Sequence, residues 1–283
     1  MVIKKIGTHP IYNFLCQNKI KASLQSAIVV VAILVSSVMA DIYYTIPSCI
    51  SGDISVTSGL WNIKFMSLAS KNINIPTNAT EWKFTGSGLV SDYYRGINNW
   101  LGWNFNTSIA GITGEGSDKF SKYTKDITAF TINPNVIFQV IKLKKVDIRV
   151  NILAGIYSFR SNFSTSAESK RSDRIKGFKN DFKTVGYTTG LTFAVKVFPW
   201  LAFSGGCSNV TLTGAYQDSQ QINDFSKPSI LNLNGDIVFG PLKKNVKIVL
   251  GFAQESSKPL FIDGKGEMNT SITSFGLQQE FGN

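Results

Sequence analysis

Histidine is nearly absent from this sequence, because His9 is the only one among 283 residues. Beyond residue 40, a serine or cysteine nucleophile therefore has no imidazole to act as its general base. The acidic residues form no pair at a spacing typical of acid–base catalysis. Metal binding is also poorly supported by two cysteines without histidine. We expect a protein that is not an enzyme and that has no catalytic residues, cofactor or metal ligands.

Cysteines and long apolar runs are scarce as well. Cys49 and Cys207 could form one disulfide after export, a pairing that the sequence leaves open. The longest uninterrupted apolar run covers residues 27–35, which is shorter than the ~20 residues that a transmembrane helix needs. No stretch after Asp41 has the length to cross a membrane as a helix.

The first forty residues have the composition of a secretory signal peptide. Lysines precede the apolar run, and small residues close it at positions 36–40. Val38 and Ala40 occupy the positions expected before a cut, so we expect cleavage between Ala40 and Asp41. An uncleaved anchor helix is the alternative. The predicted organisation is a signal peptide at 1–40, an N-terminal periplasmic lead at 41–52 and one domain at 53–283.

Period-two alternation dominates the chain after Asp41 and predicts β-strands. In residues 128–140 the even positions are mostly apolar, whereas the odd ones include Thr131, Asn133 and Gln139. Similar alternation occurs in residues 101–109, 146–156, 185–197, 231–239, 246–252 and 275–281, and more weakly in 54–65 and 81–90. A further strand is expected near residues 203–210, where the phase of the alternation changes. The pattern predicts eight strands after Trp100, or ten with the two weaker segments.

The connections between these segments alternate in length. The short ones cover residues 142–145, 199–200 and 240–245, and the long ones cover 113–126, 161–183, 218–228 and 257–267. Short turns at one end and long polar loops at the other are typical of outer-membrane barrels. The short turns fall at the end where the C-terminus lies, which should face the periplasm.

Alternation alone does not decide which face points inward, and a soluble barrel of lipocalin type would place its apolar face inside. The polar face favours a membrane barrel because it is rich in Gly, Asn, Ser and Thr. It also carries charges that could pair inside the barrel, Asp147 with Arg149 and Lys196 with Asp236. Aromatic residues near the expected strand ends could form interface girdles: Trp100, Trp103, Tyr157, Phe159, Phe198, Trp200 and Phe281.

With its alternating segments, unequal loops and apolar last strand (Phe275, Leu277 and Phe281), the chain resembles small bacterial outer-membrane barrels of the OmpA-transmembrane, OmpX and opacity-protein type. The resemblance covers residues 54–281 and concerns architecture only. It implies an all-β, antiparallel, up-and-down transmembrane β-barrel of 8 to 10 strands. It also implies outer-membrane lipid and lipopolysaccharide as surroundings, and the barrel-assembly machinery as a partner during biogenesis.

Positive charge is in excess, with 29 Lys and Arg against 18 Asp and Glu. Such an excess favours anionic partners, but its scatter over turns and loops argues against nucleic acid. The loop at 161–183 is the candidate site for an anionic ligand, such as lipopolysaccharide, an acidic polysaccharide or a host surface. A solvated loop is the alternative. Its basic residues are Lys170, Arg171, Arg174, Lys176, Lys179 and Lys183.

The sequence therefore predicts a Gram-negative outer-membrane surface protein with a structural or adhesin-like, non-enzymatic role. Two other functions stay open. A narrow pore or small-solute transport barrel becomes more plausible with ten strands and a glycine-lined lumen. A soluble secreted lipocalin-like barrel would bind a ligand inside an apolar cavity.

Overall fold

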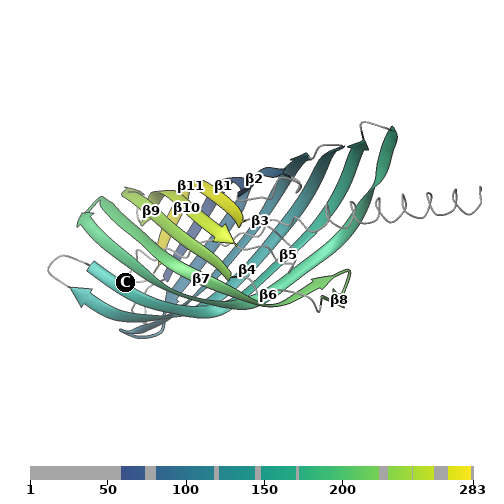
Figure 1. Ribbon diagram of the computed structural model, residues 1–283. Helices are drawn as coiled ribbons and strands as arrows, with labels where there is room; N and C mark the ends of the chain where they lie inside the picture. Colours follow the sequence, from purple (N-terminus) through teal and green to yellow (C-terminus); the bar gives the residue numbers. More distant parts are fainter. Residues whose placement is uncertain are drawn as a thin grey trace, which may run out of the picture. The chain divides into compact units, whose positions relative to one another are not determined.

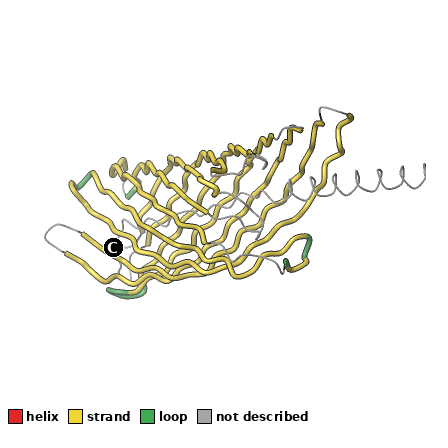
Figure 2. Tube along the Cα trace, viewed as in Figure 1, coloured by secondary structure: helices red, strands yellow, loops and turns green. Residues whose placement is uncertain are grey.

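The computed structural model describes residues 59–73, 81–117, 121–143, 148–169, 172–222, 229–243, 245–257 and 267–281. These residues are almost entirely strand (Figure 2). None of them belongs to a helix of the length and apolarity needed to cross a membrane. The predicted signal peptide, its cleavage site and the lead at 41–52 lie outside the described residues, as does Cys49. Cys207 is an exposed, free thiol on the barrel wall.

Ten long antiparallel strands close into a barrel (Figure 1). Closure follows from two sets of pairings: β1 pairs with both β2 and β11, and β7 pairs with both β6 and β9. The short strand β8 only extends one edge of β7. The predicted fold class is therefore confirmed, with ten spanning strands. The elements are β1 Gly59–Ile73, β2 Glu81–Gly96, β3 Leu101–Ser117, β4 Ser121–Leu143, β5 Ile148–Ser169, β6 Ser172–Phe198, β7 Leu201–Gln217, β8 Gln220–Gln221, β9 Ser229–Lys243, β10 Val246–Ser257 and β11 Glu267–Phe281.

The apolar face of each strand points outward. Along β3, for example, the odd-numbered Trp103, Phe105 and Ile109 are exposed, whereas the even-numbered Asn104 and Asn106 are buried. This arrangement is the reverse of a lipocalin-like barrel, whose apolar side chains line the interior. We call the outward apolar side chains the outer belt. Its members include Trp61, Ile63, Phe65, Leu89, Ile109, Phe130, Ile152, Ile156, Tyr187, Leu191, Phe193, Leu233, Phe252, Phe275 and Leu277.

The two ends of the barrel differ, as the sequence predicts. At one end, β6 turns into β7 through Pro199 and Trp200, and β2 turns into β3 through residues 97–100. Gly59 and Phe281 pair at this same end, so the barrel begins and ends there. We call it the short-turn end, and the opposite one the long end.

Two of the predicted long loops are largely strand, which corrects the sequence analysis. The segment predicted as a loop at 161–183 continues β5 to Ser169 and β6 from Ser172, with Ser161 paired to Phe182. Likewise, β3 and β4 extend to Ser117 and Ser121. The backbone ladder needs no apolar outward face once the strands have left the membrane, so polar residues continue the strands. The polar composition of these two segments therefore predicted loops, whereas the structure has β-hairpins there.

Candidate functional site

Inward-facing side chains of the described strands pack into the lumen. Near the short-turn end, four buried apolar residues from different strands form a cluster: Leu60, Tyr94, Ile137 and Leu153. They come from β1, β2, β4 and β5, which lie on the same side of the barrel. The cluster therefore packs into the lumen from that side. This cluster is the first of three layers stacked along the barrel.

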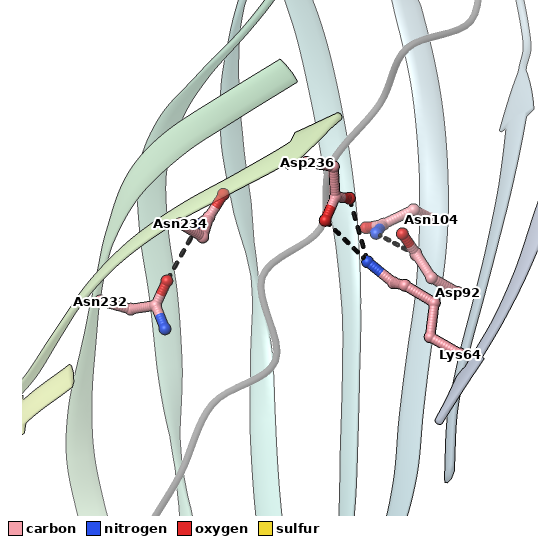
Figure 3. Close-up of polar contacts among 6 residues, drawn as sticks. All are labelled: Lys64, Asp92, Asn104, Asn232, Asn234 and Asp236. Atoms are coloured by element: carbon pink, nitrogen blue, oxygen red, sulfur yellow. Dashed lines mark hydrogen bonds and ion pairs between the residues drawn. The ribbon is translucent and has the colours of Figure 1, made fainter. Parts of the chain in front are cut away.

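The middle layer contains a buried ion pair (Figure 3). Lys64 on β1 donates to both carboxylate oxygens of Asp236 on β9, with Nζ–O distances of 3.2 and 3.0 Å. Both side chains are almost completely buried, at 3% and 4% exposure. In the sheet, β10 and β11 separate the two strands, so this contact crosses the lumen rather than following a ladder.

Asp92 lies beside this pair, as Figure 3 shows. Its carboxylate accepts a hydrogen bond from the side-chain amide of Asn104, at 3.0 Å. Both residues are buried, and they come from neighbouring strands β2 and β3. Two carboxylates therefore face one ammonium in the middle layer. Without Lys64, two anionic groups would share a water-poor site.

Further polar contacts spread this network around the lumen. The amide of Asn232 donates to Glu255 at 2.6 Å, and the amide of Asn234 donates to Asn232 at 2.9 Å. On the opposite wall, the hydroxyl of Thr188 donates to Asn133 at 3.2 Å. Buried polar groups are stable when they satisfy one another in this way. These contacts join neighbouring and next-neighbouring strands through their inward faces.

An aromatic layer fills the lumen toward the long end. Trp82 stacks on Phe84, with ring centroids 5.6 Å apart, and it also contacts Tyr123 at 6.1 Å. Lys125 is fully buried and places its ammonium 4.0 Å from the centre of the Phe163 ring, a favourable cation–π contact.

Glycines on β3 make room for these rings. A Cβ atom at Gly116 would lie 2.9 Å from the Trp82 ring, and one at Gly114 would collide with Phe84. The small residues that suggested an open lumen thus accommodate large ones. Within the described strands, no three His, Cys, Asp or Glu side chains lie close enough to hold a metal ion.

Among the predicted interior charges that the structure describes, Asp236 forms a buried ion pair with a residue that was not predicted. Asp236 is buried as predicted, but it pairs with Lys64. Lys196 is exposed near the short-turn end of β6. The register explains the difference, because Asp236 lies opposite Ser204 on β7 and that strand separates it from β6. Arg149 is half-buried on β5, and Asp147 lies outside the described residues.

The predicted basic site falls on the β5–β6 hairpin. Lys170 and Arg171 lie outside the described residues. Arg174, Lys176 and Lys179 belong to β6, and the structure does not describe their side chains. Lys183 is described, and it lines an outer-face hollow with Arg160 and Asp181. Whether these residues bind an anion stays a prediction.

The predicted aromatic girdles are confirmed only in part. The side chains of Trp100, Trp103, Phe198, Trp200 and Phe281 are exposed at the short-turn end. Phe198 stacks on Trp200 and Trp100 on Phe138, with ring centroids 5.4 and 6.1 Å apart. Tyr157 and Phe159, in contrast, are completely buried inside the barrel. Their odd numbers put them on the inward face of β5, beside Leu153, so the alternation itself would have placed them correctly.

Lys64 is the main residue that the sequence analysis missed. It lies between outward-facing Ile63 and Phe65 in a segment whose pattern looked weak, because Leu60 and Met66 put apolar residues on the inward face too. A lysine between two large apolar residues in a strand has to point into the lumen. That local pattern could have identified it as an interior charge.

No protein-family description matches the chain, and no curated protein is significantly similar to it in sequence. Among solved structures, the outer membrane protease OmpT from Escherichia coli matches with a TM-score of 0.52 and 10% identity, over 83% of this chain and 99% of OmpT. The match with OprG from Pseudomonas aeruginosa (TM-score 0.41, 9% identity) covers 83% of this chain and 100% of OprG. The match with Ail from Yersinia pestis (TM-score 0.34, 11% identity) covers 80% of this chain and 99% of Ail. Together with the closed ten-strand barrel, the likeness to OmpT shows that the chain has the fold of a small bacterial outer-membrane β-barrel.

Proposed function

We propose that this protein is exported to the bacterial outer membrane and acts there as a non-enzymatic, adhesin-like surface barrel. The observation that carries the proposal is the unequal height of the barrel wall. Strands β4, β5 and β6 have 23, 22 and 27 residues, whereas β9, β10 and β11 have 15, 12 and 15. One side of the wall is therefore built to stand above the membrane.

The length of β6 supports this geometry. At about 3.3 Å per residue, its 27 residues extend for roughly 90 Å, although about 9–11 residues suffice to cross the bilayer at a tilt. Figure 1 shows the β5–β6 hairpin reaching beyond its neighbours at the long end. Residues 172–181 of β6 pair with β5, whereas pairing with β7 begins only at Phe182. This basic, one-sided hairpin is a surface suited to an acidic partner.

The absence of histidine after His9 supports a non-enzymatic role. OmpT is a protease, but at 10% identity its likeness concerns the fold. In the lumen of this chain, the carboxylates of Asp92 and Asp236 are engaged by Asn104 and Lys64. These contacts suit a role of both carboxylates in packing and charge balance rather than in catalysis.

Shortening the β5–β6 hairpin tests the adhesin-like role. We expect replacement of residues 165–180 by a two-residue turn to weaken binding to a sulfated acidic polysaccharide at least tenfold, because five of the six candidate basic residues are lost. A full-length variant with those five residues changed to Gln should lose as much. Retention rates on an immobilised heparin-like polymer at several salt concentrations provide the measurement.

The control for charge alone is the triple variant Lys71→Gln, Lys83→Gln and Lys122→Gln, which neutralises exposed lysines elsewhere on the wall. It should bind almost as well as the unaltered protein. Equal binding by the shortened and unaltered proteins, both properly folded, would contradict the proposal.

Conductance distinguishes this role from a narrow pore. Because apolar, polar and aromatic layers fill the lumen, we expect no stable single-channel current from the purified barrel in a planar bilayer. Removing the Trp82 and Phe84 rings together should raise the frequency of brief openings. Steady, uniform conductance of the unaltered protein would favour the transport barrel instead.

A further inference from the structure

Two cationic side chains and a tyrosine stand in one row on the outer face of the barrel. Arg160 on β5 lies directly opposite Lys183 on β6, and Lys183 lies directly opposite Tyr216 on β7. Directly paired residues of antiparallel strands project on the same face, within about 4.5–5.5 Å of each other at Cβ. The sheet therefore holds these three side chains side by side.

The row lines a hollow of about 300 Å³, together with Asp181 and Ser219. Arg160 donates from Nε and Nη2 to the two carboxylate oxygens of Asp181, at 3.1 and 2.8 Å. Ser219 belongs to the tight turn after β7, in which both Asp218 and Ser219 have positive φ. The turn is anchored because the amide of Asp218 donates to the carbonyl of Asp181, and the amide of Asp181 donates to Asp218 Oδ1.

The charges in this hollow are arranged for an added anion. Like charges directly opposite each other destabilise a sheet. Of the two nearby carboxylates, Asp181 accepts from Arg160, and Asp218 accepts from the backbone amide of Asp181. None of the described residues forms an ion pair with Lys183. A guanidinium has five N–H donors, of which Asp181 uses two. The remaining donors, the ammonium of Lys183 and the hydroxyls of Tyr216 and Ser219 match the oxygens of a phosphate.

The position of the hollow relative to the outer belt indicates where this phosphate comes from. Four residues along the strands from Arg160 and Lys183, the outward-facing Ile156 and Tyr187 form part of the belt. Four strand residues correspond to about 13 Å along the strand, and to roughly 9 Å of height at a tilt of about 45°. Arg160 also lies directly opposite Phe130 of the belt, on β4. The hollow therefore borders the apolar belt on its long-end side, at the level of lipid headgroups.

We propose that Arg160, Lys183, Tyr216 and Ser219 bind the phosphate of a phosphorylated lipid headgroup in the outer leaflet. Arg160 and Lys183 contact the phosphate oxygens, while Asp181 holds the guanidinium in place. The lipid chains then lie against the belt below, around Ile156 and Tyr187. This site would hold one lipid beside the long strands β5 and β6, where they leave the outer belt. The proposal does not depend on the adhesin-like role.

Titration of the full-length barrel in nonionic detergent with bisphosphorylated lipid A, counting bound lipids by native mass spectrometry, tests the site. We expect Lys183→Gln and Arg160→Gln each to weaken binding about tenfold. The control is Lys83→Gln, which removes an exposed strand lysine that also has a carboxylate neighbour, Glu81. It should change the affinity less than twofold. An unshifted electrophoretic mobility before boiling shows that each variant is folded.

Two further ligands identify the source of the phosphate. Dephosphorylated lipid A with the same acyl chains should bind at least tenfold more weakly to the unaltered protein, and inorganic phosphate should compete only at far higher concentration than the lipid. Equal binding of the dephosphorylated lipid, or no loss in Lys183→Gln, would overturn the proposal. Competition by inorganic phosphate at the concentration of lipid itself would overturn the lipid as its source.

Discussion

Lys64→Met should destabilise the barrel by about 3–5 kcal/mol, because removing one member of a buried ion pair leaves the other charge uncompensated. Here two carboxylates are affected, since Asp236 loses its 3.0 Å partner and Asp92 lies beside it. Met keeps the length and apolar character of the lysine stem, so loss of packing contributes little. Urea unfolding of the protein in lipid vesicles, followed by tryptophan fluorescence, measures the change.

A second substitution separates lost charge balance from lost contact. Lys64→Met combined with Asp236→Leu should recover much of the stability, since both charges of the pair leave the lumen together. As a control, Lys247→Met breaks the partly exposed pair with Glu280 at the short-turn end, which should cost only about 0–1 kcal/mol. Equal effects of Lys64→Met and Lys247→Met would show that the middle layer does not depend on its ion pair.

Leu191→Arg should cost about 2–4 kcal/mol, the penalty for a basic side chain on the lipid face near the bilayer midplane. Leu191 is 55% exposed and lies on β6 between the outward Tyr187 and Phe198. In a protein surrounded by water, an exposed leucine could become arginine with almost no effect. The expected loss therefore depends entirely on lipid around the outer belt.

The matched control is the same substitution, leucine to arginine, at a different depth in the membrane. Leu242 is 61% exposed near the short-turn end of β9, where Leu242→Arg should cost only about 0–1 kcal/mol. Unfolding free energies of both variants in vesicles give the comparison. If both substitutions were equally harmless, the outer belt would not face hydrocarbon.

The period-two pattern of individual strands, together with the composition of the polar face and the unequal connections, was sufficient to predict a membrane β-barrel. In β3, for example, Trp103 and Phe105 alternate with Asn104 and Asn106, and the structure exposes the first pair and buries the second. Each inward or outward direction depends only on a residue's place in its own strand. The same rule would have placed Tyr157 and Phe159 inside, but proximity to a strand end suggested a girdle.

Contacts across the lumen could not be predicted in this way. Lys64 and Asp236 meet because strand tilt and register bring β1 and β9 to the same height, although two strands separate them in the sheet. That relation is a property of the closed barrel, whose strand number and stagger are linked. Residues 161–183 gave a related difficulty, since strands above the membrane lose their apolar face and look like loops.

Membrane fractionation, followed by gel electrophoresis with and without boiling, tests most directly whether this chain is a stable transmembrane barrel. We predict that the protein produced in a Gram-negative cell enters the outer-membrane fraction, resists extraction by alkaline carbonate and migrates differently before and after boiling. A protein that remains in the soluble fraction and shows no heat-dependent migration would contradict the account, because a barrel with this outer belt cannot remain dispersed in water.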